Sequence, residues 1–338
     1  MTADFSLVLA ILMAFAFALT NGFHDAANSI ATLVATRVAR PLPAVAMASV
    51  FNLLGPLMFG AAVANTVGTL VTVDPSHGVP VIGAGLTGAV VWNTYTWSRS
   101  LPSSSSHALV GGLVGAALLD TGPGSINLGP VQDGHLYGVL GVLVGLLVAT
   151  SLGFGVAFIV ERILLRATRR ASARLRRPVR SVQWATSAFL AFSHGSNDAQ
   201  KTVGIVAGLL VASGSATSLT APLPVVLGAS ISLTLGTALG GWGIIKTVGR
   251  RIFPIRSLDG LVSQTSSASV IFAATLVGAP VSTTQVVSSS IVGIGIGRSR
   301  WRHISWEVVR SIAVAWVTTM PAAAIIAAAA LPIWKSLP

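Results

Sequence analysis

Two short motifs, both rich in side chains that bind ions, occur once in each half of this chain. The motif GFHDAAN contains Asp25, and its counterpart GSNDAQK contains Asp198. The motif PSSSSH begins at Pro102, and its counterpart PVSTTQ begins at Pro280. Each aspartate lies within an apolar stretch, where a charge is costly and is retained mainly for function. The repetition predicts an internal duplication with one buried carboxylate in each copy.

The chemistry of these side chains favours binding an oxyanion together with a cation. Serine and threonine hydroxyls and side-chain amides can donate hydrogen bonds to the oxygens of a tetrahedral anion. Asp25 and Asp198 would repel a bare anion. We therefore expect each to hold a proton or a metal ion, or to accept a hydrogen bond from a protonated anion. Cation-coupled transport of an anion satisfies both observations.

The composition indicates an integral membrane protein built from helices. Hydrophobic residues make up 53% of the 338 residues and charged residues 9%, with a mean hydropathy of +0.80. Apolar runs of about 20 residues, long enough to cross the hydrocarbon core, recur along the chain. The alternating strands of about 10 residues that build a membrane barrel do not occur. The chain has no cysteine, which excludes thiol chemistry.

The distribution of arginines predicts the topology. Much of the net charge of +12 lies between the two copies, and we interpret this segment as a topology determinant rather than a nucleic-acid patch. It is an Arg-rich linker, residues 161–183, between a first membrane repeat, residues 1–160, and a second, residues 184–338. Placing the linker in the cytoplasm puts nearly every other arginine there and both termini outside. We expect a multi-pass protein of the cell membrane.

This topology makes the two repeats cross the membrane in opposite directions. The predicted fold class is an all-α integral membrane protein with two inverted-topology repeats, broken helices and re-entrant helical hairpins. Such repeats are typical of transporters whose site lies near the bilayer midplane, between the repeats.

Each motif also predicts an interruption of regular helix. Glycine and asparagine are poor helix formers, so we expect breaks at residues 21–24 and 194–197, with an aspartate near the start of each following half-helix. Proline followed by hydroxyl side chains predicts two hairpins, residues 81–119 and 259–297, with their tips at the site. Four half-helix N-termini would then meet and favour an anion.

Four segments closely resemble the inorganic phosphate transporter (Pit) family, bacterial type: NGFHDAANSIATLVATR, LPSSSSHALVGGLVGAAL, FSHGSNDAQKTVGIVAG and GAPVSTTQVVSSSIVGIG. The resemblance covers nearly the whole chain. It implies a secondary symporter that imports inorganic phosphate by alternating access, driven by H⁺ or Na⁺. It also implies transport as a neutral metal–phosphate complex, which bacterial members commonly use, and a homodimer. We expect no enzymatic activity and no resident cofactor.

The resemblance and the motif chemistry together assign three overlapping sets of residues. The predicted substrate-binding residues are Asp25, Asn28, Ser104, Ser105, Ser106, Asp198, Lys201, Ser282, Thr283 and Thr284. The predicted coupling-ion residues are Asp25, Asp198, His24, His107 and Gln200. The candidate metal ligands are Asp25 and Asp198.

Two neutral residues, Asn52 and Gln264, favour H⁺ over Na⁺ as the coupling ion. Gln285 stands where many relatives carry histidine, so no proton relay is assigned to this position. Sodium-coupled relatives carry carboxylates where this chain has Asn52 and Gln264, and hard cations prefer anionic oxygens. Phosphate symport coupled to H⁺ is therefore the leading hypothesis. The alternatives are Na⁺-coupled phosphate symport and a sulfate permease of the same family.

Other functional classes receive less support from the sequence. An anion channel would share the same site and would differ in lacking coupled accumulation. Ser106 and His107 are adjacent, but no carboxylate completes a triad with them, which disfavours an intramembrane hydrolase. The chain has no Walker A motif and therefore no ATPase of its own.

Overall fold

The computed structural model describes residues 5–71, 75–129, 131–132, 135–136, 138–168 and 176–338. These residues are almost entirely helical, as predicted, and β1 (Val131–Gln132) and β2 (His135–Leu136) form a short antiparallel pair. The first-half helices are α1 (Phe5–Ala35), α2 (Pro41–Met58), α3 (Ala62–Gly68), α4 (Pro75–Ser98), α5 (Ser105–Asp120), η1 (Pro123–Ser125) and α6 (Gly138–Ala167). The second-half helices are α7 (Arg176–Ala212), α8 (Leu223–Leu239), α9 (Trp242–Lys246), η3 (Thr247–Arg251), α10 (Ser257–Leu276), α11 (Thr283–Gly297), η4 (Trp301–His303) and α12 (Trp306–Lys335).

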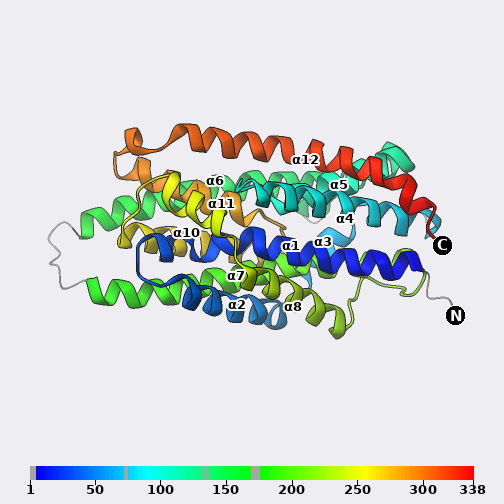
Figure 1. The fold of residues 1–338 in the computed structure, drawn as a ribbon, viewed down its shortest axis with the longest axis horizontal. Coiled ribbons are helices and arrows are strands. Elements are labelled where there is room, and N and C mark those ends of the chain that lie inside the picture. Colours follow the sequence, from blue (N-terminus) through cyan, green and yellow to red (C-terminus); the bar gives the residue numbers. More distant parts are fainter. Residues whose placement is uncertain (1–4, 72–74, 130, 133–134, 137, 169–175) are drawn as a thin grey trace.

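The two helices that carry the aspartates, α1 and α7, begin at opposite ends of the molecule (Figure 1). The start of α1 lies at the end where the C-terminus also lies, whereas α7 begins at the far end, near the end of α6. The two helices therefore run in opposite directions along the long axis.

The distribution of apolar side chains suits a lipid environment. Among the described residues, α1, α2, α6 and α12 are long and apolar enough to cross a membrane, and α8 with the following short helices adds a bent span. Leu147 and Val317 are 69% and 76% exposed, whereas Asp25 and Lys201 are each 1% exposed. Large apolar side chains thus face outward while these two charged side chains lie inside, the arrangement expected of a bundle in hydrocarbon.

Helices of one half pack mainly against helices of the other. α1 packs along α8 and α7 along α2, while α5 packs along α12 and α11 along α6. The first two contacts are equivalent to each other, because α1 corresponds to α7 and α8 to α2, and the last two are equivalent in the same way. Any site between these helices is therefore built by both halves.

The predicted helix breaks at the two Asp motifs are wrong. α1 and α7 run unbroken through residues 21–24 and 194–197. Gly22 instead allows α8 to approach, because a Cβ atom there would lie 2.2 Å from the carbonyl oxygen of Leu233. Gly195 faces α2 in the same way, at 2.3 Å from a carbonyl oxygen. Tertiary packing has overridden the low helix propensity of glycine, so neither aspartate lies at a helix N-terminus.

The chain breaks instead at the next helix pair in each half. α2 ends at Met58, and α3 begins only at Ala62. α8 ends at Leu239, and the α9–η3 segment turns away from it by 64°. Gly240, which follows α8, has a φ of +73°, in the left-handed region that glycine adopts without strain.

The helix pairs α4–α5 and α10–α11 occupy the ranges of the two predicted hairpins. In each pair, the second helix begins within the Pro-Ser or Pro-Thr motif and has a serine N-cap. Ser104 accepts a hydrogen bond from the backbone N–H of His107 at 3.2 Å, and Ser282 accepts one from Gln285 at 3.4 Å. Two helix N-termini, rather than the four expected, therefore meet inside the bundle.

The segment predicted as an Arg-rich linker, residues 161–183, is largely helical where the structure describes it. α6 continues to Ala167, α7 begins at Arg176, and residues 169–175 lie outside the described part. The predicted linker range therefore includes the end of α6 and the start of α7, because arginine is a good helix former and both helices extend past their apolar runs.

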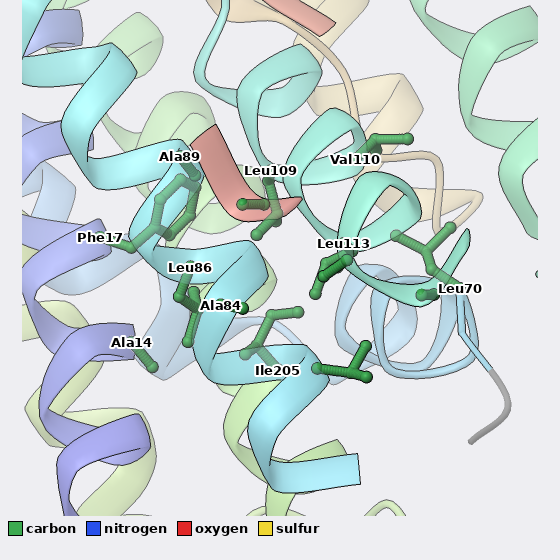
Figure 2. Close-up of a cluster of buried hydrophobic side chains, with 14 of the residues drawn as sticks. Ala14, Phe17, Leu70, Ala84, Leu86, Ala89, Leu109, Val110, Leu113 and Ile205 are labelled. Carbon is green, nitrogen blue, oxygen red and sulfur yellow. The ribbon is translucent and has the colours of Figure 1, made fainter. Parts of the chain in front are cut away.

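A cluster of buried hydrophobic side chains holds the α4–α5 hairpin against α1 (Figure 2). Phe17 of α1, Leu86 of α4 and Leu113 of α5 pack in it and are at most 2% exposed. A second cluster contains Ile271 of α10 and Ile291 of α11 and fixes the other hairpin. Close packing of this kind fixes the position of each hairpin relative to the long helix it contacts.

An ion pair lies at the end of each hairpin. The equivalent hairpin residues, Arg298 and Asp120, carry opposite charges. Arg298, just after α11, lies 2.9 Å from Glu161 of α6 (Nε to Oε1) and 3.1 Å from Asp259 of α10 (Nη1 to Oδ1). Asp120, the last residue of α5, pairs with Lys335 of α12. Each pair ties a hairpin to the last long helix of the other half.

Candidate functional site

Asp25 lies where α1 passes the tips of both hairpins. Its carboxylate accepts hydrogen bonds from the hydroxyls of Thr284 at 2.6 Å, Ser105 at 3.1 Å and Thr283 at 3.5 Å. The Nδ1 atom of His24 lies 3.1 Å from the same carboxylate. Because Ser105 belongs to α5 and the threonines to α11, hairpins from both halves meet at this one side chain.

Asn28, one helical turn beyond Asp25, completes the first half of the site. Its Nδ2 atom donates to the hydroxyls of Thr283 and Thr284, both at 3.0 Å. Its Oδ1 atom is buried and has no hydrogen-bond partner among the described residues. An unpaired acceptor therefore lies on the face of α1 that carries the aspartate.

Asp198 is the equivalent carboxylate on α7, and three side chains surround it. The Nζ atom of Lys201 donates to it at 2.5 Å, and Nδ2 of Asn21 donates at 3.2 Å. The Nε2 atom of His194 lies 3.0 Å away. Since Asn21 belongs to α1, this contact connects the two aspartate-bearing helices.

Lys201 is a buried ammonium group whose donors are fully used. Besides Asp198, its Nζ atom donates to the hydroxyl of Ser106 at 2.7 Å and to the carbonyl oxygen of Val281 at 2.8 Å. Ser106 also donates to that carbonyl at 2.8 Å. An ammonium has three donors, so these contacts satisfy it and compensate its burial.

The two halves meet at a group of potential cation ligands. Asp25, His194 and Asp198 each offer one ligand atom, and these atoms lie within 4.8 Å of one another. The sequence motifs predict the two aspartates as metal ligands but do not single out His194. The signal for it was the pseudo-repeat, since His194 and Asn21 occupy equivalent positions four residues before each aspartate, on the same helix face.

A polar chain leads away from Asp25 through His24. The Nε2 atom of His24 lies 3.0 Å from the hydroxyl of Ser103 and 3.3 Å from that of Thr96. These two hydroxyls are 2.9 Å apart. Ser103 belongs to the PSSSSH motif but is not among the predicted site residues, and Thr96 lies outside the motifs, where nothing distinguishes it from other buried hydroxyls.

Four predicted site residues have other partners. Ser104 and Ser282 serve as N-caps, and the Nδ1 atom of His107 lies 2.7 Å from the Ser104 hydroxyl. Gln200 accepts a hydrogen bond from the backbone N–H of Val63 at 2.9 Å, at the start of α3. These contacts position the hairpin tips and the α2–α3 break.

The neutral residues Asn52, Gln264 and Gln285 make ordinary hydrogen bonds. Oδ1 of Asn52 lies 3.1 Å from Nδ1 of His194, which orients that imidazole. Gln264 donates to Thr32 at 2.9 Å, and Gln285 accepts from Thr150 at 3.2 Å.

Comparison with known proteins places this chain in a family. The chain matches the model described as "Phosphate transporter family" over residues 21–327. It is 42% identical over 328 residues to a Rhizobium meliloti (strain 1021) protein named "Probable low-affinity inorganic phosphate transporter", covering 95% of this chain and 94% of that one. A Bacillus subtilis (strain 168) protein of the same name is 38% identical over 327 residues, covering 96% and 95%.

A solved structure described as "The sodium-dependent phosphate transporter" has the same fold. It superposes with a TM-score of 0.87 at 21% identity and covers 98% of this chain and 100% of that one. At this identity the likeness concerns the fold alone. The resemblance stated from the four sequence segments is confirmed, and the family and the relatives are transporters rather than enzymes. The chain belongs to the phosphate transporter family.

Proposed function

We propose that this protein is a secondary active symporter that imports inorganic phosphate together with H⁺ by alternating access. The observation that carries the proposal is the meeting of Asp25, Asp198 and Lys201 with hydroxyl-bearing hairpin tips from both halves. Buried charges that join two halves of a membrane bundle are expected at a coupled transport site.

The donors at the hairpin tips suit phosphate. Ser105 and Ser106 begin α5, and Thr283 and Thr284 begin α11, where free N–H groups and the helix dipole favour an oxyanion. Lys201 adds a positive charge. The aspartates can accept a hydrogen bond from a protonated phosphate, whereas a fully ionised sulfate has no proton to donate. This difference favours phosphate over sulfate.

The polar chain from Asp25 supports H⁺ as the coupling ion. His24 joins the carboxylate to the hydroxyls of Ser103 and Thr96, and imidazole can carry a proton at either nitrogen. Phosphate carried as a neutral metal complex would bring its own divalent ion as cargo. The ligand atoms of Asp25, His194 and Asp198 are close enough to contact such an ion.

The antiparallel course of α1 and α7 supports two inverted repeats, residues 1–160 and 184–338. We place the end of the bundle where α6 ends and α7 begins in the cytoplasm, because the arginines concentrate there. Both termini then lie outside. Alternating access would open the site first to the end with the termini and then to the cytoplasmic end.

Na⁺-coupled phosphate symport is the second candidate. The unpaired Oδ1 atom of Asn28, beside Asp25 and two threonine hydroxyls, offers oxygens of the kind a small hard cation prefers. The solved structural neighbour is itself described as sodium-dependent.

Uptake by purified protein in proteoliposomes tests the substrate assignment. We expect radiolabelled phosphate to accumulate above the external concentration under an inward H⁺ gradient, with excess sulfate failing to compete. Uptake of sulfate without uptake of phosphate would contradict the proposal. Equilibration without accumulation would indicate a channel instead.

A further inference from the structure

The ammonium of Lys201 lies in a cage of oxygens. Its three contacts are a carboxylate oxygen of Asp198, the hydroxyl of Ser106 and the carbonyl of Val281, at 2.5 to 2.8 Å. Carboxylate, hydroxyl and carbonyl oxygens are the ligands that hard metal cations select in proteins. The side chain is 1% exposed, so its charge is compensated by these protein oxygens.

The equivalent position in the other half carries no charge. Asp25 and Asp198 are 173 positions apart, and the same offset relates Asn28 to Lys201. We call Asp25, Asn28, Thr283 and Thr284 the first half-site, and Asp198, Lys201, Ser106 and Val281 the second half-site. Both half-sites combine a carboxylate on a long helix with a hydroxyl from the hairpin of the other half, Thr284 in the first and Ser106 in the second. The Val281 carbonyl of the second half-site comes from the same half as Asp198.

The carboxylate and the hydroxyl are in direct contact in the first half-site but not in the second. In the first, Thr284 donates directly to Asp25 at 2.6 Å. Ser106 occupies the position equivalent to Thr284, 178 residues earlier. In the second half-site, the ammonium bonds both Asp198 and Ser106 and so lies between them. The ammonium of Lys201 thus lies where the first half-site has the direct hydrogen bond between hydroxyl and carboxylate.

The first half-site keeps an unused cation ligand. Oδ1 of Asn28 is buried without a hydrogen-bond partner among the described residues, next to threonine hydroxyls that bond Asp25. Lys201 has no such spare oxygen and cannot ligate a metal ion while protonated. The pair therefore combines one half-site open to a mobile cation with one that already contains a cation.

We propose that Lys201 is a tethered cation that takes the place of a free monovalent ion in the second half-site and excludes Na⁺ from it. This inference rests on the proposed symport and names the residue that sets the number of cations the site accepts. A transporter with this lysine needs no Na⁺ at Asp198, because the covalently attached charge neutralises that carboxylate in every turnover.

Substitution Lys201→Asn gives the second half-site the residue of the first. Purified wild-type and K201N proteins are compared for binding of radioactive sodium in phosphate-free choline chloride. We expect K201N to bind an additional Na⁺ ion per protein, and its melting temperature to rise more than that of the wild type when Na⁺ replaces choline. Phosphate is absent, so this result is independent of whether phosphate is the transported substrate.

Two further variants make the result decisive. Lys246→Asn removes an exposed lysine of α9 and should leave Na⁺ binding at the wild-type level. The double variant Asp198→Asn with Lys201→Asn removes both charges and should not gain Na⁺. Equal Na⁺ binding by K201N and the wild type would overturn the proposal. Failure of K201N to fold in saturating Na⁺, while the double variant folds, would overturn it as well, because Na⁺ could then not replace the ammonium.

Discussion

The hydroxyl of Thr284 donates a 2.6 Å hydrogen bond to the carboxylate of Asp25, across 259 positions in the sequence. It joins the tip of the second-half hairpin to a helix of the first half. Both side chains are 1% exposed. In the proposed alternating-access cycle, this contact would open or exchange its partner for the substrate.

Thr284→Val should impair transport while preserving side-chain volume. A hydrogen bond to a charged group contributes about 1.5–3 kcal/mol. Its loss predicts a roughly tenfold to hundredfold lower kcat/KM for phosphate uptake. Initial uptake rates at varied phosphate concentration measure this. Thr318→Val, on the exposed face of α12, is the matched control, and equal rates in the two variants would contradict the assignment.

Neutralising either aspartate should abolish accumulation. Asp25→Asn and Asp198→Asn keep the side-chain shape but remove the charge that holds a proton or cation. We expect folded protein, by circular dichroism and size-exclusion chromatography, without uptake against a gradient. Glu307→Gln, an exposed carboxylate at the start of α12, should accumulate phosphate normally. Wild-type accumulation in both aspartate variants would refute their role in coupling.

Gly22→Ala should destabilise the bundle. The added methyl would lie 2.2 Å from the Leu233 carbonyl oxygen and 2.9 Å from the Cα atom of Gly236, both backbone atoms that cannot move aside cheaply. Overpacking of this kind costs about 1–3 kcal/mol. Thermal unfolding in detergent should show a lower melting temperature. Gly155→Ala, whose Cβ would meet no atom within 4 Å, should show no loss of stability, and equal melting temperatures would argue against the close packing.

Arg298→Gln should weaken the hairpin closure at the proposed cytoplasmic end. It leaves Glu161 and Asp259 buried without their shared partner. Removing one member of a buried ion pair costs about 3–5 kcal/mol. We expect a marked fall in melting temperature, with Arg302→Gln, an exposed arginine, as the control. A variant as stable as the control would show that the cluster contributes little.

Local signals predicted the hairpins, whereas long-range packing explains why the predicted breaks in α1 and α7 do not occur. Proline followed by serine or threonine ends one helix and caps the next within a few residues, so the starts of α5 and α11 were readable from the sequence. The continuity of α1 was not, because Gly22 is fixed by contact with α8, more than 200 residues away. Propensity is a weak prior when a partner helix decides the conformation.

The residues of the site that belong to the repeated motifs were predicted. Residues without a signal of their own in those motifs were not. Asp25, Asn28 and the hairpin hydroxyls were named from the motifs, and the structure brings them together. Asn21, which donates to Asp198, and the Val281 carbonyl, which accepts from Lys201, were not predicted as part of the site. An asparagine in an apolar helix looks like a helix breaker, and a backbone carbonyl leaves no trace in the sequence.

The central claim is H⁺-coupled phosphate symport, and phosphate uptake with the H⁺ and Na⁺ gradients varied independently tests it most directly. In proteoliposomes without Na⁺, an inward H⁺ gradient should drive accumulation and phosphate addition should carry protons inward. An inward Na⁺ gradient at equal pH should not drive accumulation. Strict dependence of accumulation on Na⁺, with no response to the H⁺ gradient, would contradict the account.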